Sequence, residues 1–226
     1  MKFGFDISKY QDNPDTPAIV DFSKMKSYGA SFVILRAGHA VNIDREWVKH
    51  VNNSVGILPR ASYWYYDPYF PPLAQANKYL EALDGMALEG RCWLDLEFTW
   101  QGAYSDPKHW GVFRDAITKY YRVGWYTRKS WWDSKVGAYA SIFSRDPLWV
   151  AQYSSQLTMI PKGWTRWMLW QNGTPAIGLE AGTESKEIDY NIWNDLFPFE
   201  AEWGRQEPAP SKRRLIIEGD FTVREE

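Results

Sequence analysis

Short apolar segments alternate with stretches of helical spacing along the first 126 residues of this 226-residue chain. Such alternation is typical of βα units built around a parallel sheet. We expect strands at residues 3–7, 31–37, 61–66, 91–96 and 123–126. The helices expected between them lie at residues 19–28, 44–54, 73–83 and 110–121.

The rhythm changes after residue 126. Three further short strands are expected at residues 148–152, 168–171 and 188–190, with little helical material between them. The whole pattern predicts an α/β barrel whose last third has lost most of its helices. Because a closed barrel carries its functional groups at the C-terminal ends of its strands, polar residues at these ends are the candidates for a site.

Carboxylates stand at several of these ends. Asp95 and Glu97 close an apolar strand at positions i and i+2, so they project to one side with backbones about 6 to 7 Å apart. Two acids held this close can keep one proton between them, which leaves one charged and the other ready to act as a general acid. A solvated pair of acids is the plainer alternative, but Asp6 and Asp189 also lie near predicted strand ends.

The composition narrows the choice of partner. A net charge of -2 lacks the basic excess that nucleic acid or an anionic membrane requires. The chain contains 14 Trp and 14 Tyr, and aromatic rings at strand ends can stack on an extended carbohydrate. The single cysteine, Cys92, lies in an apolar run and is expected to be a small buried hydrophobe, so no intrachain disulfide is possible.

The chain divides into a barrel at residues 1–204 and a linker with a short C-terminal tail at 205–226, where a hairpin can form around Gly219. A strand begins directly at the N-terminus, so no signal peptide is expected, and no run approaches membrane-spanning length. A chain of this kind that acts outside the cell needs another factor to release it.

Six motifs in sequence order carry a family resemblance. They are Asp6-Ile7-Ser8-Lys9-Tyr10-Gln11, Asp95-Leu96-Glu97, Trp125-Tyr126-Thr127, Leu148-Trp149-Val150-Ala151-Gln152-Tyr153, Leu169-Trp170-Gln171 and Ile188-Asp189-Tyr190-Asn191. Over residues 3 to 198 the chain resembles the glycoside hydrolase family 25 lysozymes, which include phage endolysins and bacterial autolysins. The resemblance implies an irregular TIM-like (β/α)5β3 barrel as a single domain. It also implies cleavage of the β-1,4 bond between N-acetylmuramic acid and N-acetylglucosamine in peptidoglycan.

The resemblance assigns catalytic roles to the four acids. Glu97 becomes the general acid and Asp95 its charged partner, while Asp6 and Asp189 complete the acidic floor of the groove. A neighbouring carboxylate is expected to raise the pKa of Glu97. We favour retention through the substrate's own 2-acetamido group, with Asp95 orienting it; a carboxylate nucleophile and an inverting water remain alternatives.

Several further residues are candidates for binding the glycan. Tyr63 and Tyr65 share one face of their strand, in a segment where the family has Tyr-His-Phe and this chain has Tyr63-Trp64-Tyr65. Arg36 can pair with a groove carboxylate or the substrate's lactyl acid, or form a structural salt bridge. Tyr126, Trp149 and Trp170 can stack on sugars, form hydrogen bonds to them or fill the core. Gln171 and Asn191 can contact sugar hydroxyls or orient Asp189.

No metal or cofactor is expected, because His39, His50 and His109 lack the spacing of metal ligands. A chitinase-like barrel glycosidase and a non-catalytic wall-binding protein are the alternatives to a muramidase. The expected partners are peptidoglycan glycan strands, with a holin-like release protein or attachment to a virion. The expected setting is a phage or prophage product made in the host cytoplasm that acts on the cell wall.

Overall fold

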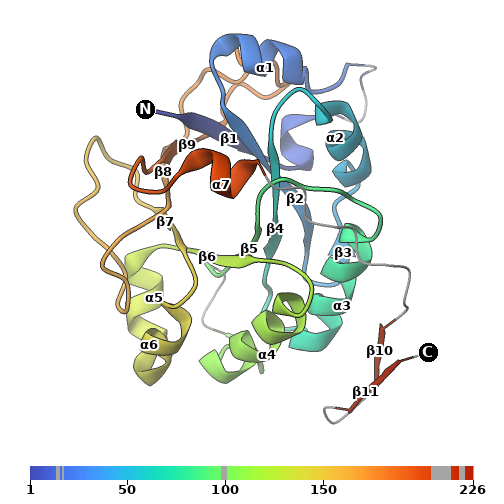
Figure 1. The fold of residues 1–226 in the computed structure, drawn as a ribbon, viewed down its shortest axis with the longest axis vertical. Coiled ribbons are helices and arrows are strands. Elements are labelled where there is room, and N and C mark those ends of the chain that lie inside the picture. Colours follow the sequence, from blue (N-terminus) through green and yellow to red (C-terminus); the bar gives the residue numbers. More distant parts are fainter. Residues whose placement is uncertain (14–15, 17, 98–100, 205–214, 219–221, 226) are drawn as a thin grey trace.

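The barrel closes through eight strands. The computed structural model describes residues 1–13, 16, 18–97, 101–204, 215–218 and 222–225. The barrel strands, in spatial order, are β1 (Phe3–Ile7), β2 (Phe32–His39), β4 (Arg60–Tyr65), β5 (Cys92–Asp95), β6 (Val123–Thr127), β7 (Leu148–Ala151), β8 (Leu169–Gly173) and β9 (Asp189–Trp193) (Figure 1). The first seven are parallel, and β9 runs antiparallel to both β8 and β1.

Each of the first five barrel strands is followed by one or two helices before the next barrel strand begins, and one short helix follows the last barrel strand. They are α1 (Phe22–Tyr28), α2 (Trp47–Ser54), α3 (Pro72–Leu83), α4 (Pro107–Thr118), α5 (Lys129–Lys135) and α6 (Ala140–Phe143), while α7 (Phe199–Trp203) follows β9. Short elements complete the described chain: β3 (Asn42–Ile43), η1 (Lys9–Gln11) and η2 (Gly137–Tyr139). Residues 152–168 and 174–188, which connect β7, β8 and β9, contain no helix. The expected irregular (β/α)5β3 barrel is therefore confirmed.

Two expected helices begin at other residues, for local reasons. The helix expected at 44–54 begins at Trp47, because Asp44 Oδ1 accepts a hydrogen bond from the backbone N–H of Glu46 and holds a turn there. The helix expected at 110–121 begins at Pro107, where Asp106 caps the N-terminus. The sequence pattern does not predict α5 and α6.

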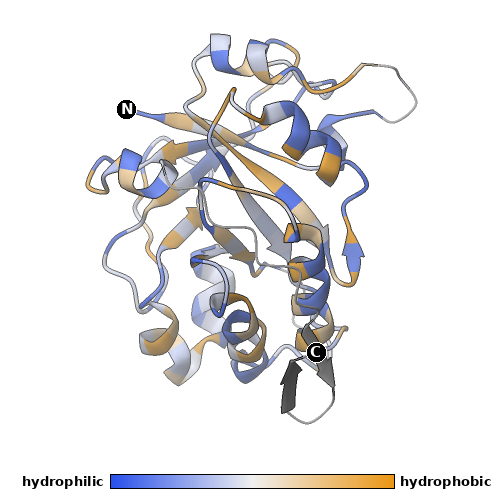
Figure 2. Cartoon of the chain, turned by 45° about the vertical axis from the view of Figure 1, so that its right-hand side comes forward, coloured by the Kyte–Doolittle hydropathy of each residue, from blue (hydrophilic) through white to orange (hydrophobic). Residues whose placement is uncertain are grey.

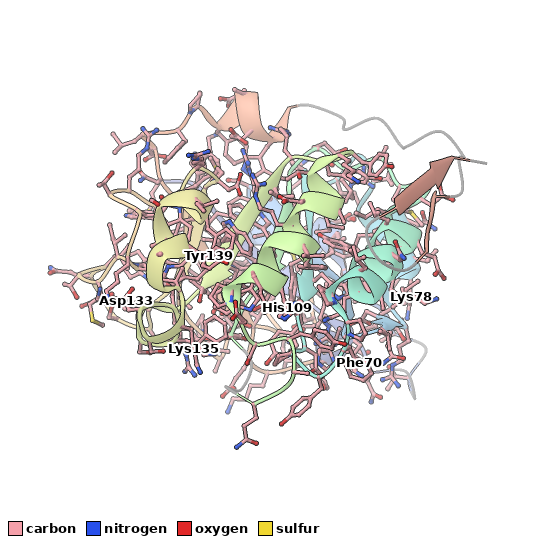
Figure 3. All side chains as sticks on the ribbon, turned by 90° about the horizontal axis from the view of Figure 1, so that it is seen from below. Phe70, Lys78, His109, Asp133, Lys135 and Tyr139 are labelled. Carbon is pink, nitrogen blue, oxygen red and sulfur yellow. The ribbon has the colours of Figure 1, made fainter. Side chains whose placement is uncertain are left out.

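Strand alternation divides the core into two layers. Along β5, Trp93 faces the barrel interior with Phe32 and Trp149, while Cys92 and Leu94 face the layer between the strands and the helices. The helices carry hydrophobic and hydrophilic residues together (Figure 2), and polar side chains such as Lys78 on α3 project outward (Figure 3). The large aromatic content is therefore used mainly to fill the core.

The interior layer is closely packed. The rings of Trp93 and Trp149 meet edge to face with centroids 5.7 Å apart, and Phe32 stacks on Trp203 of α7 at 4.5 Å. Gly124 on β6 leaves room for this layer, since a Cβ there would lie 2.3 Å from the Trp93 ring. A barrel of eight strands is wide enough only for such a filled interior.

The tail contains two short strands, β10 (Leu215–Glu218) and β11 (Thr222–Glu225), which pair antiparallel. The division at residue 204 stays a prediction. No helix in the described part of the chain is both long and apolar enough to cross a membrane.

Gly124→Ala tests the packing of the inner layer. The added methyl group collides with Trp93, so we expect the free energy of unfolding to fall by about 1 to 3 kcal/mol in urea titrations. Gly111→Ala in α4 is the matched control, because its Cβ would lie 3.8 Å from the nearest atom. That control should stabilise the protein by about 0.5 to 1 kcal/mol. Equal effects of the two substitutions would contradict the packing described here.

Candidate active site

Four carboxylates converge at one end of the barrel. Asp6 lies near the end of β1, Asp95 is the last residue of β5, and Glu97 follows two residues later. Asp189 is the first residue of β9, and because β9 is antiparallel its first residue lies at the same end as the C-terminal ends of the other strands. Asp6 and Asp189 are direct cross-strand partners. The structure therefore brings together all four acids that the sequence singles out.

Asp6 is held by two amides. It is 6% exposed, and its Oδ2 accepts hydrogen bonds from Gln171 Nε2 and Asn191 Nδ2, both at 2.8 Å. Burial and the charge of Asp189 nevertheless raise the pKa of Asp6 well above its usual value, against the two hydrogen bonds. Asp6 is therefore expected to share a proton with its neighbour rather than carry a full charge.

Asp95 is buried without such support. It is 3% exposed, and Oδ1 has no hydrogen-bond partner among the described residues. Burial raises its pKa well above the usual value, repulsion from Glu97 and Asp6 adds to this, and the charge of Arg36 opposes it. A carboxyl in these surroundings keeps its proton in the free protein.

The pKa of Glu97 is also raised, but the cause differs from the expectation. Burial is the largest cause and the charge of Asp189 contributes, while the Arg128 charge and a hydrogen bond with Tyr126 lower it. The charge of Glu97 instead helps to raise the pKa of Asp95, which is the more deeply buried of the two acids. The expected rise in the pKa of Glu97 is therefore confirmed, and the carboxylate that contributes to it is Asp189 rather than Asp95.

Asp189 completes the cluster at the more exposed side. Burial raises its pKa, while hydrogen bonds with Thr174, Tyr153 and Asp6 lower it. Thr174 donates its hydroxyl to Asp189 Oδ1 at 2.7 Å. Asp189 is thus better supplied with donors than Asp95.

Tyr63 and Tyr65 lie on β4, and the charge of Asp95 acts on both. Tyr63 packs against the inner layer, whereas Trp64 lies in the layer beneath the helices, as alternation requires. Burial and the charges of Asp95 and Glu97 raise the pKa of Tyr65, so this side chain lies close to both acids. Their contact with a glycan stays a prediction.

The amides of Gln171 and Asn191 connect Asp6 to aromatic side chains in the barrel interior. Tyr126 donates its hydroxyl to Gln171 Oε1 at 2.8 Å, which turns the Gln171 amide nitrogen toward Asp6. Asn191 is held in the same way, since Trp149 Nε1 donates to its Oδ1 at 2.8 Å. Both amides are therefore directed at the side chain of Asp6 rather than at that of Asp189, and their contact with sugar hydroxyls stays a prediction.

Trp149 and Trp170 are both buried, which agrees with the core-filling alternative rather than with stacking on a sugar. Trp149 is 1% exposed and supports Asn191 from below. Trp170 points to the outer face of the barrel, where it packs with Val150 and donates Nε1 to the carbonyl of Gln152 at 2.7 Å. The cause is strand alternation: with Gln171 directed inward, Trp170 must face outward.

Arg36 forms the structural salt bridge. Its Nε lies 2.7 Å from Asp44 Oδ2, and its side chain is largely buried. Its charge also lowers the pKa of Asp95 without forming an ion pair with it. Contact between Arg36 and a substrate acid stays a prediction.

Sequence reasoning missed Tyr153, Arg128 and Thr174 as parts of this site. Tyr153 donates its hydroxyl to Gln171 Oε1 at 3.1 Å. Arg128 and Thr174 directly follow β6 and β8, and Tyr153 is the second residue after β7. The strand-end rule that identified the acids could therefore have identified these three residues.

A cavity of about 570 Å³ lies at the opposite end of the barrel. Its lining includes Arg91 and Arg122, and both contact Glu202 of α7. It contains none of the four clustered acids. The cavity is therefore separate from the acid cluster and forms the outer side of the α7 contact.

The comparison with protein families agrees with this geometry. Residues 5–174 match the family described as "Glycosyl hydrolases family 25". The chain belongs to this family. It is a glycoside hydrolase, and the acid cluster lies where a barrel enzyme carries its active site.

Relatives and solved structures extend the comparison. Lysozyme M1 of Streptomyces globisporus is 25% identical over 206 residues, which cover 84% of this chain and 67% of that protein. An N,O-diacetylmuramidase of Arthroderma benhamiae is 27% identical over 192 residues and 75% of each chain. The crystal structure of a bacterial lysozyme from Streptomyces coelicolor has a TM-score of 0.70 at 22% identity, covering 90% of this chain and 95% of the other.

The raised pKa of Asp95 predicts a dependence of stability on pH. The folded protein keeps this proton at pH values where the unfolded chain has lost it, so stability falls as pH rises above about 4. Asp95→Asn removes this loss and should raise the free energy of unfolding at pH 7 by about 1 kcal/mol or more. The gain should vanish near pH 4 in urea titrations.

Asp195→Asn, at an exposed carboxylate, is the control and should change stability by less than about 0.5 kcal/mol at either pH. A lower stability of Asp95→Asn at pH 7 would show that Asp95 is ionised in the folded protein.

Proposed function

We propose that this glycoside hydrolase is a peptidoglycan muramidase that cleaves the β-1,4 bond between N-acetylmuramic acid and N-acetylglucosamine. The observation that carries the proposal is the cluster of four buried or half-buried carboxylates with raised pKa values at the barrel end. Membership of family 25 and the relatives named lysozyme and N,O-diacetylmuramidase support it.

Glu97 is the general acid in this proposal. It is the more exposed member of the Asp95 and Glu97 pair, so a glycosidic oxygen in the groove can reach it. Its raised pKa keeps a share of the protein protonated toward neutral pH, which general-acid catalysis requires. Arg128 and Tyr126 prevent the pKa from rising further, so the acid can still give up its proton.

Asp95 acts on the acetamido group of the substrate. In the free protein Asp95 holds a proton. The role of Glu97 as general acid requires Asp95 to be charged and Glu97 to be protonated once the glycan is bound. Glu97 gives its proton to the glycosidic oxygen as the bond from that oxygen to the anomeric carbon breaks, and the acetamide oxygen attacks the same carbon to form a cationic ring beside Asp95. A nearby positive charge lowers the pKa of a carboxyl. Asp95 then orients and stabilises that ring, and water opens it with retention of configuration.

The other residues of the site have three roles in this proposal. Tyr63, Tyr65 and Arg36 contact the glycan from the side of β2 and β4. Gln171 and Asn191 hold Asp6 as an acceptor. Asp6 and Asp189 position the acetamido group and the incoming water.

The proposed activity is tested by mass spectrometry of the soluble products from purified peptidoglycan. Wild type should release fragments with new reducing-end N-acetylmuramic acid. Glu97→Gln should lower the rate about 100-fold or more, because it removes the proton donor. Glu180→Gln, at an exposed position, is the matched control and should leave the rate unchanged.

Other products would identify the alternatives. New reducing-end N-acetylglucosamine, or faster release from chitin, would support a different barrel glycosidase. Binding to walls without any soluble product would support a wall-binding protein.

Proton NMR of the same digest at early times tests whether cleavage retains the configuration of the anomeric carbon. The β-anomer of the new reducing end should appear first, and initial α-anomer would contradict retention.

The peptidoglycan strand is the partner in this proposal. The holin-like release protein, attachment to a virion and phage or prophage origin stay predictions. Detection of the protein in purified virions, or release of its activity only after membrane permeabilisation, distinguishes the two modes of delivery.

A further inference from the structure

Tyr153 combines an exposed ring with an anchored hydroxyl. The residue is 62% exposed and lies two residues after β7, at the end of the barrel that carries the acids. Its hydroxyl lies 3.1 Å from Gln171 Oε1, and burial of this end, together with the nearby charge of Asp189, raises its pKa to about 12. The ring therefore stands in solvent while its tip reaches the acid cluster.

The backbone beneath Tyr153 is firmly held. Trp170 donates to the carbonyl of Gln152 at 2.7 Å, and the N–H of Gln152 donates to the carbonyl of Gln171 at 3.0 Å. The Gln152 side chain braces the following loop through Oε1, which accepts from the N–H of Met159 at 2.9 Å. An exposed ring in this setting loses little conformational freedom on binding a ligand.

Gln171 connects Tyr153 to the acids. Its Oε1 accepts the hydroxyls of both Tyr126 and Tyr153, which leaves Nε2 to donate to Asp6 at 2.8 Å. Tyr153 also forms a hydrogen bond that lowers the pKa of Asp189. Its hydroxyl thus contacts, directly or through one amide, both members of the cross-strand acid pair.

We propose that Tyr153 contacts the substrate: its ring forms the groove wall on the β7 side and stacks on a pyranose ring, while its hydroxyl positions Gln171 and Asp189. The inference rests on the proposed function for the identity of the glycan. A pyranose presents a C–H face that packs on an aromatic ring, and Tyr65 supplies an aromatic side chain on the β4 side. The ring and the hydroxyl have separate consequences, so two substitutions distinguish them.

The experiment compares Tyr153→Leu with Tyr153→Phe in the full-length protein, using steady-state kinetics on soluble peptidoglycan fragments. Tyr153→Leu removes the ring contact and should raise KM between about twofold and tenfold. Tyr153→Phe keeps the ring, so KM should stay within about twofold of wild type. Loss of the hydroxyl raises the pKa of Asp189 in this variant, so the acidic limb of the profile of kcat/KM against pH should move to higher pH.

Tyr28→Leu is the control, because Tyr28 ends α1 at the opposite end of the barrel and is 38% exposed. Thermal unfolding of all variants identifies any loss of fold. An unchanged KM in Tyr153→Leu, or an equal rise of KM in both variants, would overturn the stacking role. An unchanged pH profile in Tyr153→Phe would overturn the positioning role.

Binding measurements keep this inference separate from the proposed function. Titration of the Glu97→Gln protein with an N-acetylated glycan oligomer, followed by tryptophan fluorescence, requires no turnover. A protein that carries both Glu97→Gln and Tyr153→Leu should bind the oligomer between about twofold and tenfold more weakly. Unchanged affinity would overturn the stacking role. Absence of products from the wild-type enzyme would instead contradict the proposed muramidase, whatever the binding result.

Discussion

Desolvation of four carboxylates at one end of the barrel is the interaction on which the rest of this structure depends. Burying acids side by side costs folding free energy, and the chain offsets part of that cost with a few placed donors. Asp6 receives two amide hydrogen bonds, whereas Asp95 Oδ1 has none among the described residues. Burial nevertheless raises the pKa of both acids well above the usual value, so the cluster holds protons of the kind that acid catalysis requires.

The fold explains how the acids meet. Because β9 is antiparallel to β1, its first residue, Asp189, lies at the end of the barrel that carries the acids. There it pairs with Asp6 of β1. Beneath them, Trp149 fixes Asn191 and Tyr126 fixes Gln171, so the aromatic interior also orients the amides that contact Asp6. The abundance of aromatic residues thus serves the site mostly from below, through packing and orientation.

Much of this was predictable from the sequence because its signals are periodic. Strand ends located Asp6, Asp95, Glu97 and Asp189, and the loss of helical spacing located the irregular part of the barrel. Sequence gave no means of deciding whether Trp170 or Gln171 faces inward, since a shift of one residue reverses a strand's faces. Nor could it assign the cause of a pKa shift, because burial depth and the charges of Arg128 and Asp189 depend on tertiary contacts.

The most direct test of this account is a titration of the Asp and Glu side-chain carboxyl groups by ¹³C NMR in the ligand-free protein. The account predicts that Asp95 and Asp6 remain protonated well above the usual range for aspartate, and that Glu97 releases its proton before Asp95. Titration of all four acids near pH 4 would contradict it, because the cluster would then be fully ionised at neutral pH and hold no proton for the glycosidic oxygen.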